Sequence, residues 1–452
     1  MSETRLTAYG DFAANFIEER LEKLCDPSGG VQTGPFGSQL HQHDYVPIGT
    51  PIITVEHLGE NRILHQGVPL VSDDDKERLS KYTLRKGDIV FSRVGSVDRR
   101  ALVTEAEEGW LFSGRCLRVR PDPNKIDSVY LSYFFGLPSF KEHIRAIAVG
   151  ATMPSLNTEI LSNVVVLYPP DLNEQRAIAR ILSSLDDKIE LNRRMNQTLE
   201  AMARAIFKSW FVDFDPVRAK ADGREPEGMD ADTAALFPDG FEDSDIGEIP
   251  KGWIVRSIGD VVNVLGGGTP STIETSYWEG GIHSFCTPKD MSSLTSPILL
   301  NTERHLTDKG LVKVSSGQLP IGTVLMSSRA PIGYLAISEI PVSINQGIIA
   351  MVCDKDLPNL YVLNWAQTNM EGFIAVANGS TFLEISKWNF RPIKVLVPPT
   401  SILKEFMRAI DPVYLQITNN AKQSLTLEEL RNAILPRLIS GEIPVNGRDV
   451  VP

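Results

Sequence analysis

The feature that most constrains the fold is an uninterrupted apolar stripe between Asn173 and Phe211. Its members follow one another at helical steps, and neither glycine nor proline breaks the run. The stripe predicts one helix of about 39 residues, roughly 58 Å long at 1.5 Å per residue. A helix of that length needs a partner for its apolar side. The stripe consists of Ile178, Leu182, Leu185, Ile189, Met195, Leu199, Met202, Ile206 and Trp210.

A second copy of the stripe supplies that partner. Even its polar interruption recurs, because Asn192 is matched by Asn420, 228 residues later. An isolated stripe is more often buried against its own globular domain, but two matched stripes favour an intramolecular antiparallel coiled coil. The asparagines, against each other or against their neighbours, then fix the register at some cost in stability. The second stripe consists of Phe406, Ile410, Val413, Ile417, Leu427, Leu430, Ile434 and Leu438. The expected pairing positions are Leu185, Ile189, Asn192, Leu199 and Ile206 with Val413, Ile417, Asn420, Leu427 and Ile434.

The regions before the two helices also repeat. Gly150–Pro170 aligns without a gap on Gly379–Pro399, and Gly87–Arg93 aligns on Gly322–Arg329 with a slip of one residue. This repeat indicates duplication of a whole unit and pseudo-twofold symmetry. Short β-type runs and one helical piece indicate an α/β or α+β fold. In the first module these are Thr50–Val55, Asp88–Phe91, Cys116–Val119 and Val164–Leu167, with the helical piece at Val129–Ile147.

The chain divides into seven segments on this basis. We expect a short helical lead-in without an assigned role, then a module, a helix, an acidic linker, a second module, a second helix and a tail. Phe211, Phe214, Phe237 and Phe241 are expected to hold the linker, an exposed connector, against the surface. The segments are 1–20, 21–170, 171–211, 212–250, 251–399, 400–441 and 442–452.

The formal charge of −12 disfavours nucleic-acid binding when it is taken as a whole. Residues 212–250, however, hold twelve acidic and three basic residues, so this segment supplies nine of the twelve negative charges. The rest of the chain is near neutral and can carry local basic surfaces.

Other features exclude several classes of protein. The sequence starts without a pattern typical of a signal peptide and has no apolar run of about 18 residues, so we expect a cytoplasmic protein without a membrane span. The four cysteines stand far apart, which predicts reduced core residues and no metal site. His41 and His43 are interpreted as a surface pair. Tyr168-Pro-Pro-Asp171 has the wrong order for an amino-methyltransferase loop, and no nucleotide-binding glycine motif occurs, so no catalytic residues are expected.

Two glycine-rich loops are candidate DNA contacts, because glycine lets backbone N–H groups approach a phosphate closely. Tight turns explain these loops equally well. Arg93 and Arg329 follow β-type runs at places that the repeat makes equivalent, and arginine forms bidentate contacts with guanine or phosphate. The loop candidates are Gly34, Gly37, Ser38, Gly267, Gly268 and Thr269. The further basic candidates are Arg99, Arg100, Arg115, Lys289, Lys387 and Arg391.

Together, several motifs resemble the DNA specificity subunit of type I restriction-modification systems, and the likeness covers nearly the whole chain. The first module departs from the pattern because it lacks the Pro-x-Gly-Trp motif that stands before the second. The motifs are Gly34-Pro-Phe-Gly-Ser-Gln-Leu40, Pro250-Lys-Gly-Trp253, Gly267-Gly-Thr-Pro-Ser271, Tyr277-Trp278, Thr287-Pro-Lys-Asp290, Ser328-Arg-Ala-Pro-Ile-Gly333 and Phe207-Lys-Ser-Trp-Phe-Val-Asp-Phe-Asp-Pro216.

The resemblance implies that each module is a target recognition domain that reads one half of a bipartite, asymmetric site in double-stranded DNA. The paired helices would be a spacer that docks two methyltransferase subunits. The chain would bind no cofactor and do no chemistry; S-adenosylmethionine would bind the methyltransferases, and ATP and Mg²⁺ the partner subunits of the complex, which include restriction subunits. Two alternatives are a stand-alone DNA-modifying enzyme with duplicated domains and a coiled-coil scaffold that does not bind DNA.

Overall fold

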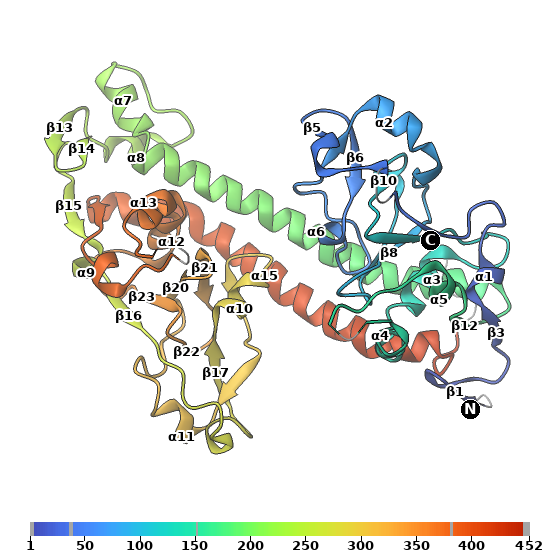
Figure 1. The fold of residues 1–452 in the computed structure, drawn as a ribbon. Coiled ribbons are helices and arrows are strands. Elements are labelled where there is room, and N and C mark those ends of the chain that lie inside the picture. Colours follow the sequence, from blue (N-terminus) through green and yellow to red (C-terminus); the bar gives the residue numbers. More distant parts are fainter. Residues whose placement is uncertain (1–3, 36–38, 151, 380–382, 446–452) are drawn as a thin grey trace. The chain divides into compact units, whose positions relative to one another are not determined.

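The computed structural model describes residues 4–35, 39–150, 152–379 and 383–445. It divides into two compact units, Met1–Lys188 with Leu427–Pro452, and Ile189–Thr426. Each unit contains one module and a segment of each long helix (Figure 1). In the part of the chain that is described, no helix is both long and apolar enough to cross a membrane.

The two long helices are α6 (Leu172–Phe211) and α15 (Thr400–Ile439), each of 40 residues, which confirms the prediction from the stripes. In the second unit they run antiparallel. Asn192 Nδ2 donates to Ser424 Oγ (3.3 Å), and Asn420 Nδ2 donates to Asn196 Oδ1 (2.9 Å). Asn420 and Ser424 stand 228 residues after Asn192 and Asn196. The two contacts are therefore equivalent in the repeat, as pseudo-twofold symmetry requires.

The seam between the helices differs from the expected stripe at several positions. Asn192 and Asn420 are buried, but Met195 and Met202 are 37% and 51% exposed. Asn196, 3% exposed, takes the inward position, and its Nδ2 donates to the Ile417 carbonyl (3.2 Å). A buried amide is tolerated there because hydrogen bonds satisfy it. Of the other expected pairing residues, Ile417 is buried, and Leu185, Ile189, Leu199, Ile206, Val413, Leu427 and Ile434 are partly buried.

The first module contains two four-stranded sheets, in the orders β10-β6-β7-β5 and β4-β11-β8-β9. All four predicted strands form. The predicted helical piece is two helices, α3 and α4, because Pro138 starts a new one. The elements are β4 (Val31–Thr33), β5 (Tyr45–Val46), β6 (Thr50–Ile53), η3 (Val55–His57), β7 (Leu70–Val71), α2 (Asp73–Arg78), η4 (Ser80–Tyr82), β8 (Ile89–Ser92), β9 (Arg100–Leu102), η5 (Glu105–Glu107), β10 (Leu111–Phe112), β11 (Cys116–Val119), α3 (Ser128–Phe134), α4 (Pro138–Ile147), α5 (Thr158–Ser162) and β12 (Val165–Tyr168).

The second module contains a five-stranded sheet, β16-β23-β20-β21-β18, and a three-stranded sheet, β19-β17-β22. Its large core includes the ends of both long helices that belong to this unit. The elements are β15 (Ile254–Ser257), α9 (Ile258–Val261), β16 (Asn263–Gly266), η6 (Thr275–Tyr277), β17 (His283–Cys286), α10 (Pro288–Ser292), β18 (Ile298–Leu299), β19 (Arg304–Leu306), α11 (Asp308–Leu311), β20 (Val324–Ser328), β21 (Ile332–Ser338), β22 (Val342–Ile344), β23 (Ile348–Val352), α12 (Asn359–Thr368), α13 (Met370–Ala375), α14 (Lys387–Phe390) and β24 (Lys394–Val397).

The prediction of a helical lead-in without a role is wrong. Residues 4–20 form three strands, β1 (Thr4–Thr7), β2 (Gly10–Ala13) and β3 (Ile17–Arg20), followed by α1 (Leu21–Leu24). Gly10 turns the chain at a φ of 106°, which glycine adopts without strain, so a hairpin replaces the helix. β3 then pairs antiparallel with β12, which ties the start of the chain into the first module.

The acidic linker is more ordered than an exposed connector. It contains α7 (Asp215–Ala221), α8 (Ala231–Ala235) and a hairpin of β13 (Phe241–Ser244) and β14 (Gly247–Pro250). Phe237 is 1% exposed, and Phe214 packs on Phe241 with ring centroids 6.0 Å apart, so the aromatics hold the segment as expected.

The β13–β14 hairpin repeats β1–β2. Gly247 has a φ of 102°, and Ser244 Oγ donates to the Gly247 carbonyl (2.6 Å) as Thr7 Oγ1 donates to that of Gly10 (2.7 Å). Phe16 therefore occupies the place of Trp253, and the duplicated unit begins before residue 21.

Candidate DNA-contact residues

The glycine-rich loops fit tight packing against the protein's own backbone. Gly34 directly follows β4 and Gly267 directly follows β16. An added Cβ would lie 2.2 Å from the Ser113 carbonyl oxygen at Gly34, and 1.7 Å from that of Ile344 at Gly267. Only glycine fits such a close approach, so packing against the protein's own backbone accounts for both residues.

The remaining loop candidates are engaged locally or lie outside the described residues. The Gly268 N–H donates to the Ile344 carbonyl (3.1 Å), and Thr269 Oγ1 donates to Gln346 Oε1 (2.6 Å). Gly37 and Ser38 lie outside the described residues. Phosphate contact by either loop stays a prediction.

The proposed equivalence of Arg93 and Arg329 is wrong. The Leu156 N–H donates to the Arg93 carbonyl, and the Ile385 N–H donates to that of Ser328. Because Leu156 and Ile385 are matched in the gap-free repeat, Ser328 is the counterpart of Arg93. The isolated bridges agree, since Val94 pairs with Ser155 and Arg329 pairs with Glu384, and the same repeat matches Ser155 with Glu384. The two strands therefore align without the one-residue slip in the sequence alignment that matched Arg93 with Arg329.

Arg93 and Arg329 have different surroundings. Arg93 is partly buried and donates to the Gly114 carbonyl (3.2 Å). The Arg329 side chain is 39% exposed and forms an ion pair with Glu384 at 3.7 Å. Arg115 is exposed, and among the described residues no hydrogen bond or ion pair engages its guanidinium.

The prediction of a DNA contact is wrong for Arg100. Its side chain is 2% exposed, with Nε donating to the Ser132 carbonyl (2.9 Å) and Nη1 paired with Glu60 (3.2 Å). The side chain joins β9 to α3 inside the module and cannot reach DNA. Arg99 is partly buried and donates to the Leu58 carbonyl.

The basic candidates of the second module are exposed. Lys289 is paired with Glu303 at 2.7 Å, and Arg391 donates to the Val264 carbonyl (2.8 Å). Lys387 lies on α14, where its side chain covers Gly266. Beside it, Trp388 is 83% exposed, and the sequence reasoning did not single it out. The helix spans four residues, so no periodicity marked this face.

The cysteines are free thiols in or near the cores, as predicted. Burial raises the pKa of Cys25 and of Cys116 to about 12, so neither thiol ionises readily near neutral pH. Within the described ranges, no group of three His, Cys, Asp or Glu side chains is arranged to hold a metal ion.

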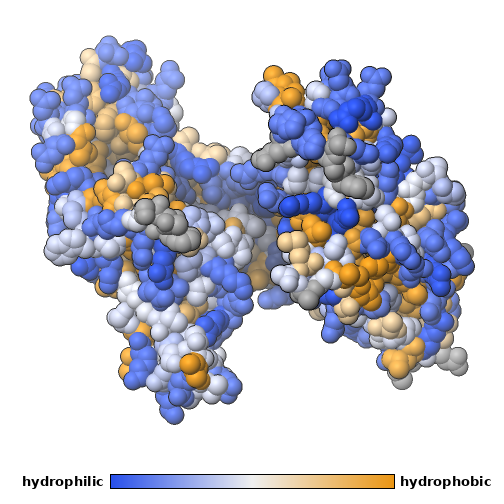
Figure 2. Space-filling view, in the orientation of Figure 1, coloured by the Kyte–Doolittle hydropathy of each residue, from blue (hydrophilic) through white to orange (hydrophobic). Residues whose placement is uncertain are grey.

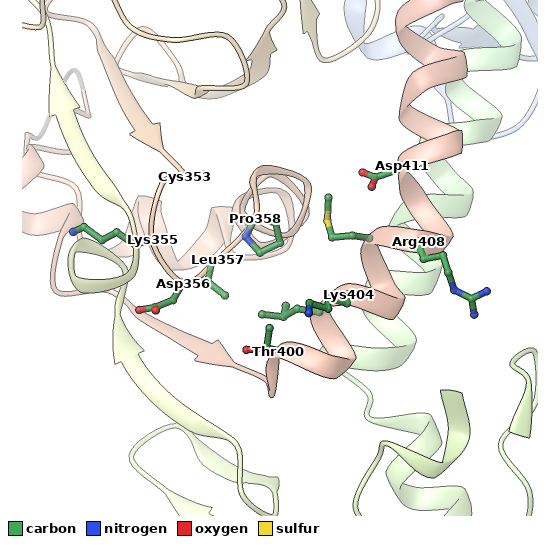
Figure 3. A pocket seen from close by; sticks show the side chains of 11 residues that line it. Cys353, Lys355, Asp356, Leu357, Pro358, Thr400, Lys404, Arg408 and Asp411 are labelled. Atoms are coloured by element: carbon green, nitrogen blue, oxygen red, sulfur yellow. The ribbon is translucent and has the colours of Figure 1, made fainter. Parts of the chain in front are cut away.

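A groove of about 530 Å³ lies in the second unit between α15 and the loop after β23 (Figure 3). Leu357, Pro358 and Met407 give it apolar walls, and Lys404 and Asp411 lie along its α15 side. Figure 2 shows hydrophilic and hydrophobic residues interspersed on this face. One group of apolar residues lies where Figure 1 draws β13, β14 and α8.

The comparisons with known proteins agree with the duplicated architecture. A family model described as "Type I restriction modification DNA specificity domain" matches residues 38–201 and 250–429. The chain is 27% identical over 427 residues to the type I restriction enzyme HindI specificity subunit of Haemophilus influenzae, covering 85% of this chain and 92% of that protein. It is 26% identical over 324 residues to the MjaIX specificity subunit of Methanocaldococcus jannaschii, covering 70% and 69%. The crystal structure of a type I S subunit from M. genitalium shares the fold, with a TM-score of 0.55 and 16% identity over 94% of this chain and 96% of that one.

Proposed function

Because the chain belongs to the family of type I restriction-modification DNA specificity subunits, we propose that its modules read the two halves of a bipartite, asymmetric sequence in double-stranded DNA. The observation that carries this proposal is the tandem match of the specificity domain, at 38–201 and 250–429. Each match extends from a module into its long helix. Two modules with different side chains at equivalent places suit a target with two different halves.

The basic side chains that remain candidates for DNA contact are Arg93, Arg115, Arg329, Lys289, Lys387 and Arg391, together with Arg99. Arg115 and Lys387 are the best placed, because both are exposed and neither side chain forms a hydrogen bond or ion pair among the described residues. Trp388 adds an exposed ring beside Lys387 that can stack or wedge against a base step.

The helix pair has two roles in this proposal: it sets the spacing of the half-sites and docks two methyltransferase subunits. The exposed side of α6 supports docking. Leu191, Met195 and Met202 are 51%, 37% and 51% exposed, and steps of four and seven residues place them on one side of the helix. Methionine side chains adapt to a partner surface, so this stripe suits a helix of another subunit.

The chain directs chemistry that other subunits perform. The relatives are named specificity subunits, and this supports a non-catalytic role. S-adenosylmethionine then belongs to the methyltransferase subunits, and ATP and Mg²⁺ belong to the restriction subunits.

Methylation mapping tests the proposal. The chain assembled with its methyltransferase subunits should methylate one bipartite DNA sequence, and the purified chain alone should transfer no labelled methyl group. Methylation by the chain alone would favour a stand-alone modifying enzyme. No salt-dependent DNA binding, even with methyltransferase present, would favour a scaffold that does not bind DNA.

A further inference from the structure

Polar side chains of the first unit surround a pocket of about 470 Å³, where the first module meets both long helices. Six of these side chains form hydrogen bonds or ion pairs with one another. They are Glu60, Arg100, Tyr133 and Lys141 from the module, Asp186 from α6 and Arg431 from α15.

Asp186 joins three elements through one carboxylate. Its Oδ2 accepts from the Tyr133 hydroxyl of α3 (2.6 Å), and its Oδ1 accepts from Arg431 Nη1 of α15 (2.5 Å). The side chains of Asp186 and Arg431 are 10% and 16% exposed. Such contacts are short and directional, and removing one partner strands a charge away from water. They therefore fix geometry more strongly than a surface ion pair.

The module also contacts the backbone of Asp186 and forms ion pairs on the other side of the pocket. Arg62 Nη2 donates to the Asp186 carbonyl (3.2 Å). Across the pocket, Arg100 and Lys141 both pair with Glu60 at 3.2 Å. Glu60 is more open to solvent, with its side chain 58% exposed, so the tightly held centre is the Tyr133–Asp186–Arg431 group.

At the positions equivalent to Tyr133 and Asp186, the second module has a contact between two neutral side chains. Tyr130 of α3 and Tyr361 of α12 each donate to a strand carbonyl, of Leu167 and Leu396, so these helices correspond. Three residues after each tyrosine stand Tyr133 and Asn364. Asn364 Nδ2 donates to the hydroxyl of Tyr414 (3.3 Å), which stands 228 residues after Asp186. At these matched positions, the charged contact is specific to the first module.

We propose that Asp186 and Arg431 are positioning residues that fix the orientation of the first recognition module on the long helices, and thereby the spacer that the protein accepts. They hold the module and take no part in reading bases. This inference rests on the proposed function, because a spacer has meaning only for a bipartite target.

The test uses the full complex with its methyltransferase subunits. Its substrate is a DNA library in which the two half-sites are separated by spacers of varied length, and methylation is read for every spacer. The wild-type complex should prefer one length by about tenfold or more over its neighbours, as for one defect in a specific site. Asp186→Asn removes the charge and keeps the size. It should spread methylation to spacers one base pair shorter and longer, erasing most of that preference, while both half-site sequences stay unchanged.

Two further variants keep the test decisive. Tyr133→Phe removes one hydrogen bond to Asp186 and leaves the ring in place, so it should broaden the preference less. If thermal denaturation shows that Asp186→Asn does not fold, the spacer preference of Tyr133→Phe tests the proposed role of Asp186 instead. Arg437→Gln is the matched control, because Arg437 also lies on α15 and pairs with Glu442, but with both side chains more than half exposed (52% and 57%). It should keep the wild-type spacer.

Three results separate the possible failures. An unchanged spacer preference in the folded Asp186 and Tyr133 variants would overturn the inference. A changed half-site sequence would also overturn it, because the residues would then act on base reading. If the wild-type complex methylated sites that are not bipartite, the proposed function itself would be wrong.

Discussion

Lengthening the helix pair tests whether it measures the distance between half-sites. One heptad is inserted into each helix at facing points, after Thr198 in α6 and after Leu415 in α15. These points lie within about one turn of each other, because Asn196 Nδ2 donates to the Ile417 carbonyl. The asparagine contacts around Asn192 and Asn420 stay intact on one side of the insertion. A heptad with leucine at its inward positions preserves the apolar seam.

The magnitude follows from helix geometry. Seven residues at 1.5 Å each add about 10.5 Å to each helix. At about 3.4 Å per base pair, that corresponds to about three more base pairs between the half-sites. Three pairs also rotate the DNA by roughly 100°, at 10 to 10.5 pairs per turn. The complex must absorb this rotation, so we expect a lower rate of methylation at the longer spacer.

The assay is methylation mapping with the same spacer library. The half-site sequences should stay the same, and the preferred spacer should grow by about three base pairs. A four-residue insertion in each helix serves as a comparison, because it disturbs the heptad register and should impair folding or assembly. An active heptad variant that methylates only the original spacing would show that the helices do not set the distance.

Three further predictions concern the same helices. Met195→Asp with Met202→Asp should weaken assembly with methyltransferase subunits, measured by titration calorimetry. The free energy of unfolding of the free chain should fall by only about 1 kcal/mol, the helix-propensity cost of two aspartates, since both side chains are exposed. Equal affinity would remove this stripe from the docking surface. Burial raises the pKa of Glu200 to about 7, and its buried Oε1 has no hydrogen-bond partner among the described residues. The folded state therefore binds the proton more tightly than the unfolded chain, and this residue's contribution to stability is lost as pH rises from about 4.5 to 7. Glu200→Gln should then raise the denaturation midpoint more at pH 8 than at pH 5, and an equal effect at both would contradict the assignment. Pro412 stands inside α15, where its ring nitrogen cannot donate to the carbonyl four residues earlier; Pro412→Ala should stabilise the chain by up to about 3 kcal/mol in chemical denaturation, and no gain would show that the helix is adapted to the proline.

The sequence predicts the long helices and the duplication well, because both depend on patterns within the chain. Tertiary contacts decide the places where prediction failed. Phe12, Phe16 and Ile17 have spacings that suit a helix, but Gly10 starts a hairpin and β3 pairs with a strand about 150 residues later. Met195 is apolar enough for the seam. Asn196 faces α15 instead, because it hydrogen-bonds there with the Ile417 carbonyl and the Asn420 side-chain amide.

The candidate site is less predictable than the fold, because a charged side chain does not reveal its partner in the sequence. In the sequence, nothing distinguishes Arg100 from a surface arginine. In the structure, it is buried and contacts Glu60 and the Ser132 carbonyl. The slip that matched Arg93 with Arg329 rested on residue type, and only the backbone contacts show that Ser328 stands in that place. The exposure of Trp388 is likewise a product of the fold.

The duplication allows each module to serve as the control for the other. Thr54 and Thr287 both cap a short helix whose third residue, His57 or Asp290, accepts from their own N–H. The second residue of that helix is Glu56 in the first module and Lys289 in the second, so equivalent surface positions carry opposite charges.

This difference yields a paired prediction. If this surface faces DNA in both modules, Lys289→Gln removes one phosphate contact. It should weaken binding of the complex to all DNA sequences alike and lower the slope of log K against log salt by about 1. Glu56→Gln at the matching position removes a repulsion and should strengthen binding slightly. Fluorescence anisotropy at several salt concentrations measures both slopes. A Lys289 variant with the wild-type slope would place this surface away from the phosphates, and the exposed Arg115 and Lys387 would then define the DNA-facing side.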